Sequence, residues 1–125
     1  MDTKVKHPLK AIILEDDLMS KMILDNFCEN HPDIELKADF DDIDAAIQYL
    51  NNHEVDLVFL DIQLKYSNGF ELLTYLKPST KVVITTVDTD NVTEAATYGI
   101  NNTLIKPITL EQFLWSVKRV NDFAA

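Results

Sequence analysis

Acidic side chains follow two apolar runs of the sequence, in places where they could together hold a divalent cation. Glu15, Asp16 and Asp17 come directly after the run LKAIIL, and Asp61 ends the run DLVFLD. Crowded carboxylates repel one another unless a cation joins them. Hard oxygen ligands with room for water suit Mg²⁺, which usually binds one or two carboxylates together with phosphate oxygens. If these residues meet in space, the acidic pocket implies Mg²⁺.

A hydroxyl and an ammonium group extend this set. Thr85 and Thr86 end the run KVVITT, and Lys106 ends the run TLIK. A Lys ammonium can neutralise one phosphoryl oxygen, and a Thr hydroxyl can donate a hydrogen bond to another. The expected chemistry is attack of the Asp61 carboxylate on a phosphorus atom, with the metal and Lys106 stabilising charge on the equatorial oxygens. Each residue alone is weak evidence, because acidic clusters commonly cap helices and Lys-Pro pairs commonly lie in loops.

The elements that must position these residues are read from hydrophobic periodicity. Strands are expected at 9–14, 34–39, 56–61, 81–86 and 103–106, and helices at 18–29, 43–52, 69–76, 92–98 and 110–122. Three of the strands are nearly continuous Ile, Leu, Val and Phe, as in a parallel sheet covered by helices on both faces. In such a doubly wound α/β sandwich the ligand site lies beyond the carboxyl ends of the strands. The candidate residues stand at four of these ends.

Length and charge restrict the remaining possibilities. The 125 residues fit a single domain, 1–125, with a core over about 9–120, and 46% of them are hydrophobic. A net charge of −10 disfavours nucleic-acid binding and favours proteins and cations as partners. Without a membrane-spanning run or a secretory signal, a cytoplasmic protein is expected. The one cysteine, Cys28, is expected to be a small buried hydrophobe.

The motifs also carry a family resemblance. They are IILEDD at 12–17, LVFLDIQL at 57–64, Gly69, ITT at 84–86, and KP at 106–107. Together they resemble the receiver domain of response regulators in two-component signalling, over about 9–120. The resemblance implies a flavodoxin-like (βα)5 sandwich with a five-stranded parallel sheet in the order 2-1-3-4-5. It also implies phosphorylation of Asp61 by a sensor histidine kinase.

In the metal site of that family, the resemblance assigns the ligands to Glu15, Asp16, Asp61 and the backbone carbonyl of Gln63. Asp16 is favoured over Glu15, because Asp is commoner at the first acidic position. Asp17 comes one residue too late and is expected to cap a helix. Asp41 or Asp42 is likewise expected to cap the start of the second helix.

The switch hydroxyl of the family falls on Thr86, with Thr85 the less favoured choice. Thr86 lies twenty residues before Lys106, a spacing that resembles receivers joined to LytTR DNA-binding domains. The resemblance also implies a cis peptide bond between Lys106 and Pro107. The complete protein would then be a transcriptional regulator, although this segment itself is not expected to bind DNA.

Three residues depart from the family pattern. Lys65 stands where Pro is frequent, which predicts a more mobile loop, and Thr103 stands where an aromatic residue usually reads out the switch. Asp88 lies two residues past Thr86, and together with Gln63 it is expected to tune the lifetime of the phosphoryl group.

Alternative functions differ in what they do with the acidic pocket. A pseudo-receiver would keep the fold as a docking module that phosphorylation does not switch. A phosphotransfer enzyme of the haloacid dehalogenase type would need a second acid where Gln63 stands, so catalysis beyond self-phosphorylation and autodephosphorylation is not expected. A homodimer, if formed, is expected through helix 4, strand 5 and helix 5, at 92–98, 103–106 and 110–122.

Overall fold

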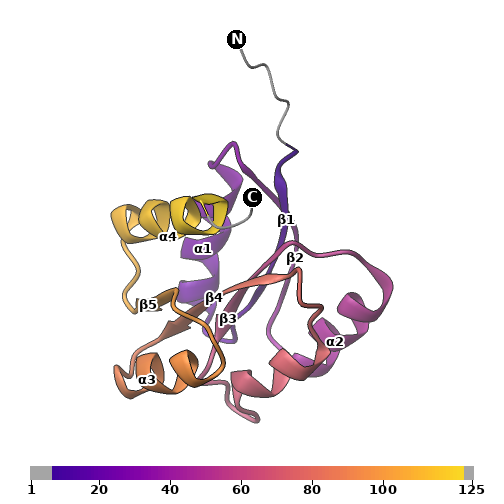
Figure 1. Cartoon of the computed structure of the whole chain (residues 1–125), viewed down its shortest axis with the longest axis vertical. Coiled ribbons are helices and arrows are strands. Elements are labelled where there is room, and N and C mark those ends of the chain that lie inside the picture. Colours follow the sequence, from indigo (N-terminus) through magenta and orange to yellow (C-terminus); the bar gives the residue numbers. More distant parts are fainter. Residues whose placement is uncertain (1–6, 123–125) are drawn as a thin grey trace.

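Five parallel strands form one sheet at the centre of the computed structural model, which describes residues 7–122 (Figure 1). The strand order is β2-β1-β3-β4-β5, as predicted. Register is fixed by neighbouring pairs such as Ile13 with Phe59 and Asp61 with Thr85. The strands are β1 (Leu9–Leu14), β2 (Ile34–Phe40), β3 (Leu57–Asp61), β4 (Lys81–Thr86) and β5 (Thr103–Ile105).

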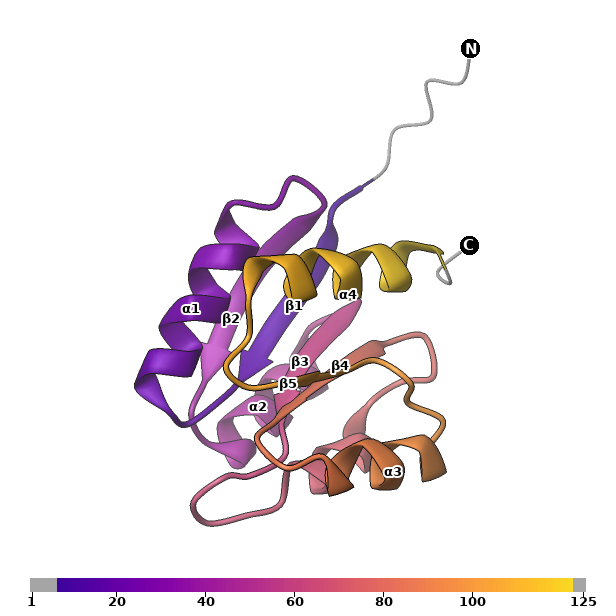
Figure 2. The ribbon, with the colours of Figure 1, turned by 90° about the vertical axis from the view of Figure 1, so that its left-hand side faces the viewer.

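Helices cover both faces of the sheet. Figures 1 and 2 show α1 and α4 on one side and α2 and α3 on the other. The bounds are α1 (Leu18–Glu29), α2 (Ile43–Asn52), the short 3-10 helix η1 (Gly69–Tyr75), α3 (Asp90–Thr97) and α4 (Leu110–Asp122). No helix in the described range 7–122 is long and apolar enough to cross a membrane.

The core has two halves because alternate strand residues face opposite sides of the sheet. Ile13 and Phe59 pack with Phe113 of α4, whereas Ile12 and Leu60 pack toward α2, η1 and α3. All five side chains are fully buried, and each burial of this kind contributes about 1.5–3 kcal/mol. The continuous apolar runs of the strands therefore reflect a sheet with no solvent face.

Cys28 lies on the inner face of α1, in the half of the core that includes Phe113. It is fully buried, as expected for a small hydrophobe. Burial is the main cause that raises the pKa of its thiol to about 12, and the carboxylates of Asp25 and Glu29 add to the effect. The thiol is therefore protonated and unreactive in the folded protein.

Two acidic side chains cap helices, in agreement with the sequence. The Asp17 carboxylate accepts a hydrogen bond of 2.9 Å from the amide of Ser20 at the start of α1. Asp42 does the same for α2, accepting from the amides of Asp44 and Ala45. These carboxylates accept hydrogen bonds from amides that lack a partner within their own helix. Helix capping therefore explains both acidic residues, and no bound ligand is needed to explain them.

The segment after β3 differs from the prediction. The apolar pattern predicts an α-helix at 69–76, but η1 (Gly69–Tyr75) is a 3-10 helix that starts from a capping box between Asn68 and Glu71. Phe70, Leu73 and Leu76 recur every three residues, a spacing that places side chains in line in a 3-10 helix and on one face of an α-helix alike. The apolar pattern therefore could not separate the two forms.

Gly69 brings η1 close to the end of β3. Its amide donates to the Ile62 carbonyl at 2.9 Å, and a Cβ atom at this position would overlap the backbone carbonyl oxygen of Asp61. Only glycine lacks that atom. Gly69 thus fixes the path of the chain immediately beyond the candidate phosphoacceptor.

Candidate functional site

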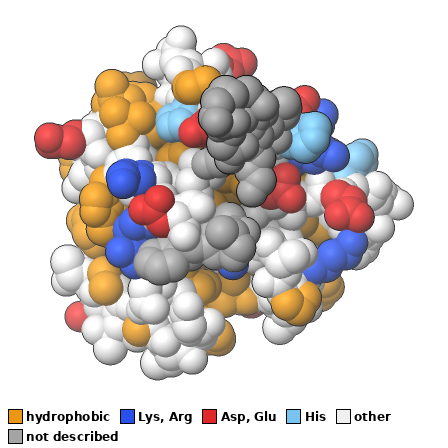
Figure 3. All heavy atoms as spheres, turned by 45° about the horizontal axis from the view of Figure 1, so that its top comes forward, with side chains coloured by type: hydrophobic (Ala, Val, Ile, Leu, Met, Phe, Trp, Pro, Cys, Tyr) orange, Lys and Arg blue, Asp and Glu red, His pale blue; other side chains and the backbone are white. Residues whose placement is uncertain are grey.

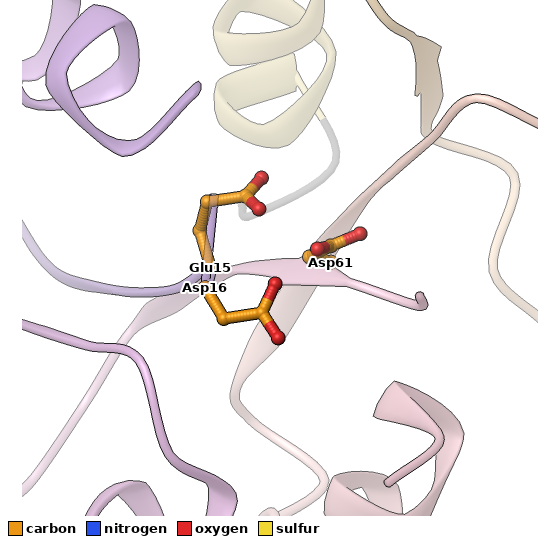
Figure 4. Close-up of side chains that lie close together, drawn as sticks. All are labelled: Glu15, Asp16 and Asp61. Atoms are coloured by element: carbon orange, nitrogen blue, oxygen red, sulfur yellow. The ribbon is translucent and has the colours of Figure 1, made fainter. Parts of the chain in front are cut away.

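Three carboxylates meet at the carboxyl edge of the sheet. Glu15 and Asp16 follow β1, and Asp61 ends β3, the neighbouring strand. One carboxylate oxygen from each lies within 4.8 Å of the other two, and in Figure 4 all three groups extend to the same side. Glu15 and Asp61 are buried, whereas Asp16 is partly exposed. The topology therefore gathers residues that are 46 positions apart in the chain, from 15 to 61.

Lys106 is the basic residue in contact with this cluster. It follows β5, and its Nζ lies 2.6 Å from Glu15 Oε1 and 3.3 Å from Asp61 Oδ1. Its side chain is 13% exposed, so the ion pairs are largely shielded from water. The peptide bond between Lys106 and Pro107 is cis, the form that the resemblance implied. One ammonium group is thus shared by the two buried carboxylates of the cluster.

Burial and the neighbouring negative charge both favour the protonated form of Asp61. Burial, followed by the hydrogen bond and charge of Glu15, raises the pKa of Asp61 to about 7. Lys106 and the amide of Gln63, which donates to Asp61 Oδ1 at 3.1 Å, act in the opposite direction. Without a further cation, the Asp61 carboxyl is therefore partly protonated near neutral pH.

Asp16 is held from the other side of the site. Its Oδ2 accepts a hydrogen bond of 2.6 Å from the backbone amide of Lys65, in the loop between β3 and η1. A proline at position 65 would have no amide proton to donate. The departure at Lys65 thus supplies a bond that orients a candidate metal ligand.

Thr86 reaches the site through Gln63. Its hydroxyl donates to Gln63 Oε1 at 3.3 Å, and it accepts from Asn91 Nδ2 at 2.7 Å and from the amide of Asp88 at 3.1 Å. Thr85 is also fully buried, but its hydroxyl has no hydrogen-bond partner within residues 7–122. Between the two adjacent hydroxyls, it is therefore Thr86 that is connected to the loop after β3.

The carboxylate cluster fits a hard divalent cation. Glu15 Oε1 is buried and, apart from its ion pair with Lys106, receives no hydrogen bond from any described residue. Three carboxylates against one ammonium leave negative charge that a cation would compensate. Glu15, Asp16 and Asp61 supply oxygen ligands only, which is the donor chemistry that Mg²⁺ prefers.

Elsewhere the surface charges are mixed. Figure 3 views the molecule from the end at which β1 begins, where acidic and basic side chains are interspersed. A surface hollow between η1 and α3 is lined by none of the five residues of the candidate site, Glu15, Asp16, Asp61, Thr86 and Lys106. Neither surface brings buried carboxylates together as the carboxyl edge of the sheet does.

Comparison with known proteins identifies the family. A profile described as the response regulator receiver domain matches residues 11–118. The chain belongs to the response regulator receiver family. Receivers of this family are phosphorylated by sensor histidine kinases, generally bind Mg²⁺ at an acidic pocket, and serve as signalling modules rather than as enzymes.

Individual relatives agree with this assignment. The receiver is 30% identical over 110 residues to the transcriptional regulatory protein MalR of Bacillus subtilis, covering 84% of this chain and 47% of MalR. It is 26% identical over 114 residues to the sensory transduction protein LytT of Bacillus anthracis, covering 89% of this chain and 46% of LytT. The chain thus spans about half the length of these curated relatives.

Solved structures confirm the fold. The response regulatory domain of mrkE from Klebsiella pneumoniae superposes with a TM-score of 0.82 at 22% identity, covering 91% of this chain and 96% of that one. A CheY-like receiver domain from Methanospirillum hungatei gives 0.79 at 20% identity, covering 92% and 95%. These likenesses support the (βα)5 architecture of the receiver.

Not every residue singled out in the sequence joins the cluster. The Asp88 carboxylate of this receiver is exposed and accepts from the amide of Asp90, a local contact at the start of α3. Thr103 is half-buried in β5, and its hydroxyl has no hydrogen-bond partner among the described residues. The functional roles assigned to both residues stay predictions.

Sequence reasoning missed one member of the site. Asn91 donates to the Thr86 hydroxyl from the first turn of α3, five positions further along the chain. The sequence does offer a signal, because an Asn side chain in the first turn of a helix can reach back to the end of the preceding strand. It is easily overlooked, since Asn91 carries no charge and matches no motif. Asn91 and Gln63 together orient the Thr86 hydroxyl.

Proposed function

We propose that this receiver accepts a phosphoryl group on Asp61 from the phosphohistidine of a sensor histidine kinase, in a Mg²⁺-dependent reaction. The observation that carries the proposal is the buried cluster of Glu15, Asp61 and Lys106, with Lys106 Nζ 2.6 Å and 3.3 Å from the two carboxylates. Glu15, Asp16 and the carbonyl of Gln63 would complete the metal site with Asp61. The general chemistry of the family supports the same assignment.

In the proposed step, a carboxylate oxygen of Asp61 forms a bond to phosphorus while the bond from phosphorus to the donor nitrogen breaks. The electron pair of that bond leaves with the imidazole of the kinase. Mg²⁺, when bound, would supply positive charge to the equatorial oxygens of the transferring group. Lys106 would neutralise a phosphoryl oxygen, and the Thr86 hydroxyl would donate a hydrogen bond to another.

The protonation of Asp61 fits this division of roles. A carboxyl whose pKa is raised to about 7 is a weaker nucleophile at neutral pH than a carboxylate, because part of it carries a proton. A cation bound beside it would favour the charged form. The acidic surroundings therefore couple nucleophilicity at Asp61 to occupation of the metal site.

We propose further that the segment regulates an output domain in a longer protein, and that a LytTR-type DNA-binding domain makes that protein a transcriptional regulator. Support comes from MalR, a transcriptional regulatory protein, and LytT, a sensory transduction protein, which are each about twice as long as the matched region. A homodimer is proposed through α3, β5 and α4, where Val92, Leu114 and Trp115 are exposed. Its test is the molar mass in solution with and without phosphorylation.

The decisive experiment is phosphorylation by acetyl phosphate with Mg²⁺, followed by intact-mass measurement. We expect a single adduct that is stable in acid and labile in base. It should be lost with EDTA and in Asp61→Asn, but retained in Asp41→Asn, which makes the same change at an exposed carboxylate. No adduct would favour a docking module that is not switched. Rapid, continuing hydrolysis of acetyl phosphate would favour a phosphotransfer enzyme.

A further inference from the structure

The Thr86 hydroxyl has its only proton committed to the side chain of Gln63. Thr86 Oγ1 accepts from Asn91 Nδ2 at 2.7 Å and from the amide of Asp88 at 3.1 Å. Both partners are N–H groups, which can only donate. These two bonds use the acceptor positions of the hydroxyl, so its proton points to the remaining neighbour, Gln63 Oε1, at 3.3 Å.

The same oxygen of Gln63 receives a second hydrogen bond. The backbone amide of Val87 donates to Gln63 Oε1 at 3.2 Å. Because a backbone amide cannot accept, the side-chain atom that faces Val87 is the oxygen and not the nitrogen. Two donors at the end of β4 therefore converge on the side-chain oxygen of Gln63. The backbone amide of the same residue donates to Asp61 Oδ1 at 3.1 Å.

We infer that the Gln63 carboxamide oxygen occupies the place of a phosphoryl oxygen in the unphosphorylated receiver and must be displaced when Asp61 is phosphorylated. The inference rests on the proposed function, in which the Thr86 hydroxyl donates a hydrogen bond to the phosphoryl group. A hydroxyl has a single proton, so it cannot serve both oxygens at full strength. Gln63 is thus an autoinhibitory latch as well as a residue beside the acceptor.

The strength of the latch suits a reversible device. Gln63 is exposed, its bonds of 3.2 and 3.3 Å are long, and both join neutral groups. A phosphoryl oxygen carries charge, and hydrogen bonds to charged acceptors are about twice as strong. The phosphoryl group should therefore displace Gln63 as the acceptor for the Thr86 hydroxyl and the Val87 amide. Breaking the bonds to Gln63 should weaken the apparent affinity for a phosphoryl mimic about fivefold, equivalent to ~1 kcal/mol at 25 °C.

Substitution of Gln63 by methionine tests the latch. Gln63→Met keeps the length of the side chain and the backbone amide that donates to Asp61, but it removes the carboxamide oxygen. The matched control is Gln48→Met, the same change at an exposed position on α2. Binding of beryllofluoride with Mg²⁺ is measured by titration calorimetry. We expect about fivefold tighter binding in Gln63→Met and no change in Gln48→Met.

A second measurement reads the latch directly. Hydrogen exchange of the Val87 amide should accelerate at least fivefold in unliganded Gln63→Met, because its acceptor has been removed, and stay as in the wild type in Gln48→Met. Equal beryllofluoride affinities, or an unchanged Val87 exchange rate, would overturn the inference while leaving Asp61 as the acceptor. Wild-type protein that fails to bind beryllofluoride would overturn both the latch and the proposed function.

Discussion

Replacing Asp61 by asparagine should stabilise the folded receiver in the absence of divalent cations. Burial and the neighbouring Glu15 raise the pKa of Asp61 to about 7, from 3.8 for an unperturbed Asp. A carboxyl with a raised folded-state pKa contributes its full stability below about pH 4, and that contribution is lost as the pH rises through 7. The Asp61→Asn variant has no charge to bury at this position, so it avoids the loss.

The magnitude follows from the pKa shift. About three pKa units correspond to an upper limit of ~4 kcal/mol above pH 7. The pKa already includes the attraction between Asp61 and Lys106. We expect about half of the upper limit, ~2 kcal/mol, because relaxation and water penetration reduce the cost of a buried charge. For a domain of this size, the melting temperature should then rise by roughly 8 °C. At pH 4.5 the gain should fall to about a quarter, since the wild-type carboxyl is then mostly protonated.

The assay is thermal unfolding followed by circular dichroism in EDTA, at pH 7.5 and at pH 4.5. Asp41→Asn, at an exposed site, serves as the control for the change of residue type and should shift stability by less than ~0.5 kcal/mol. Saturating Mg²⁺ should reduce the difference between wild type and Asp61→Asn, because the cation stabilises the charged carboxylate. A variant that is no more stable than wild type at pH 7.5, or whose gain is independent of pH, would refute the reasoning.

Three further changes test other parts of the structure. Lys65→Pro removes the amide that holds Asp16 and should weaken Mg²⁺ binding roughly tenfold by calorimetry, whereas Lys65→Ala keeps the amide and should bind normally. Gly69→Ala should cost roughly 3 kcal/mol or more in urea unfolding, because the added Cβ meets the Asp61 carbonyl; a loss below about 1 kcal/mol would contradict this close approach. Asp25→Asn should be stabilising at pH 7.5 but not at pH 4, by under ~1 kcal/mol, because burial and then Asp39 raise the pKa of Asp25 to about 6; equal gains at both pH values would count against it.

Much of the fold was predictable because its signals are strong and local. Runs such as LVFLD are apolar at nearly every position, and the sheet buries both faces of β3, so the strands could be placed to within a residue or two. The meeting of Glu15, Asp61 and Lys106 followed from topology alone, since parallel strands end at one edge. What topology could not give was the pairing within the site, where Lys106 lies closer to Glu15 than to Asp61.

The contacts of polar backbone groups were beyond the reach of the sequence. Lys65 departs from the family pattern in a way that predicts a loose loop, but its amide holds Asp16 at 2.6 Å, a bond that depends on the path of the chain and not on the side chain. Asn91 was missed for a similar reason, because its partner Thr86 is fixed by the approach of α3 to β4. Periodicity reports which side chains are buried, not which amides meet a given oxygen.

The solitary thiol of Cys28 gives this receiver an intrinsic reporter of global opening. A disulfide reagent cannot reach a group at 0% exposure, and a thiol with a pKa of about 12 offers almost no thiolate to attack it. Modification therefore requires the packing between α1 and α4 to come apart. With excess reagent, the rate of thiol modification measures how often the core opens. The effect of Mg²⁺ or of phosphorylation on that frequency can therefore be followed in the wild-type protein, with no introduced probe.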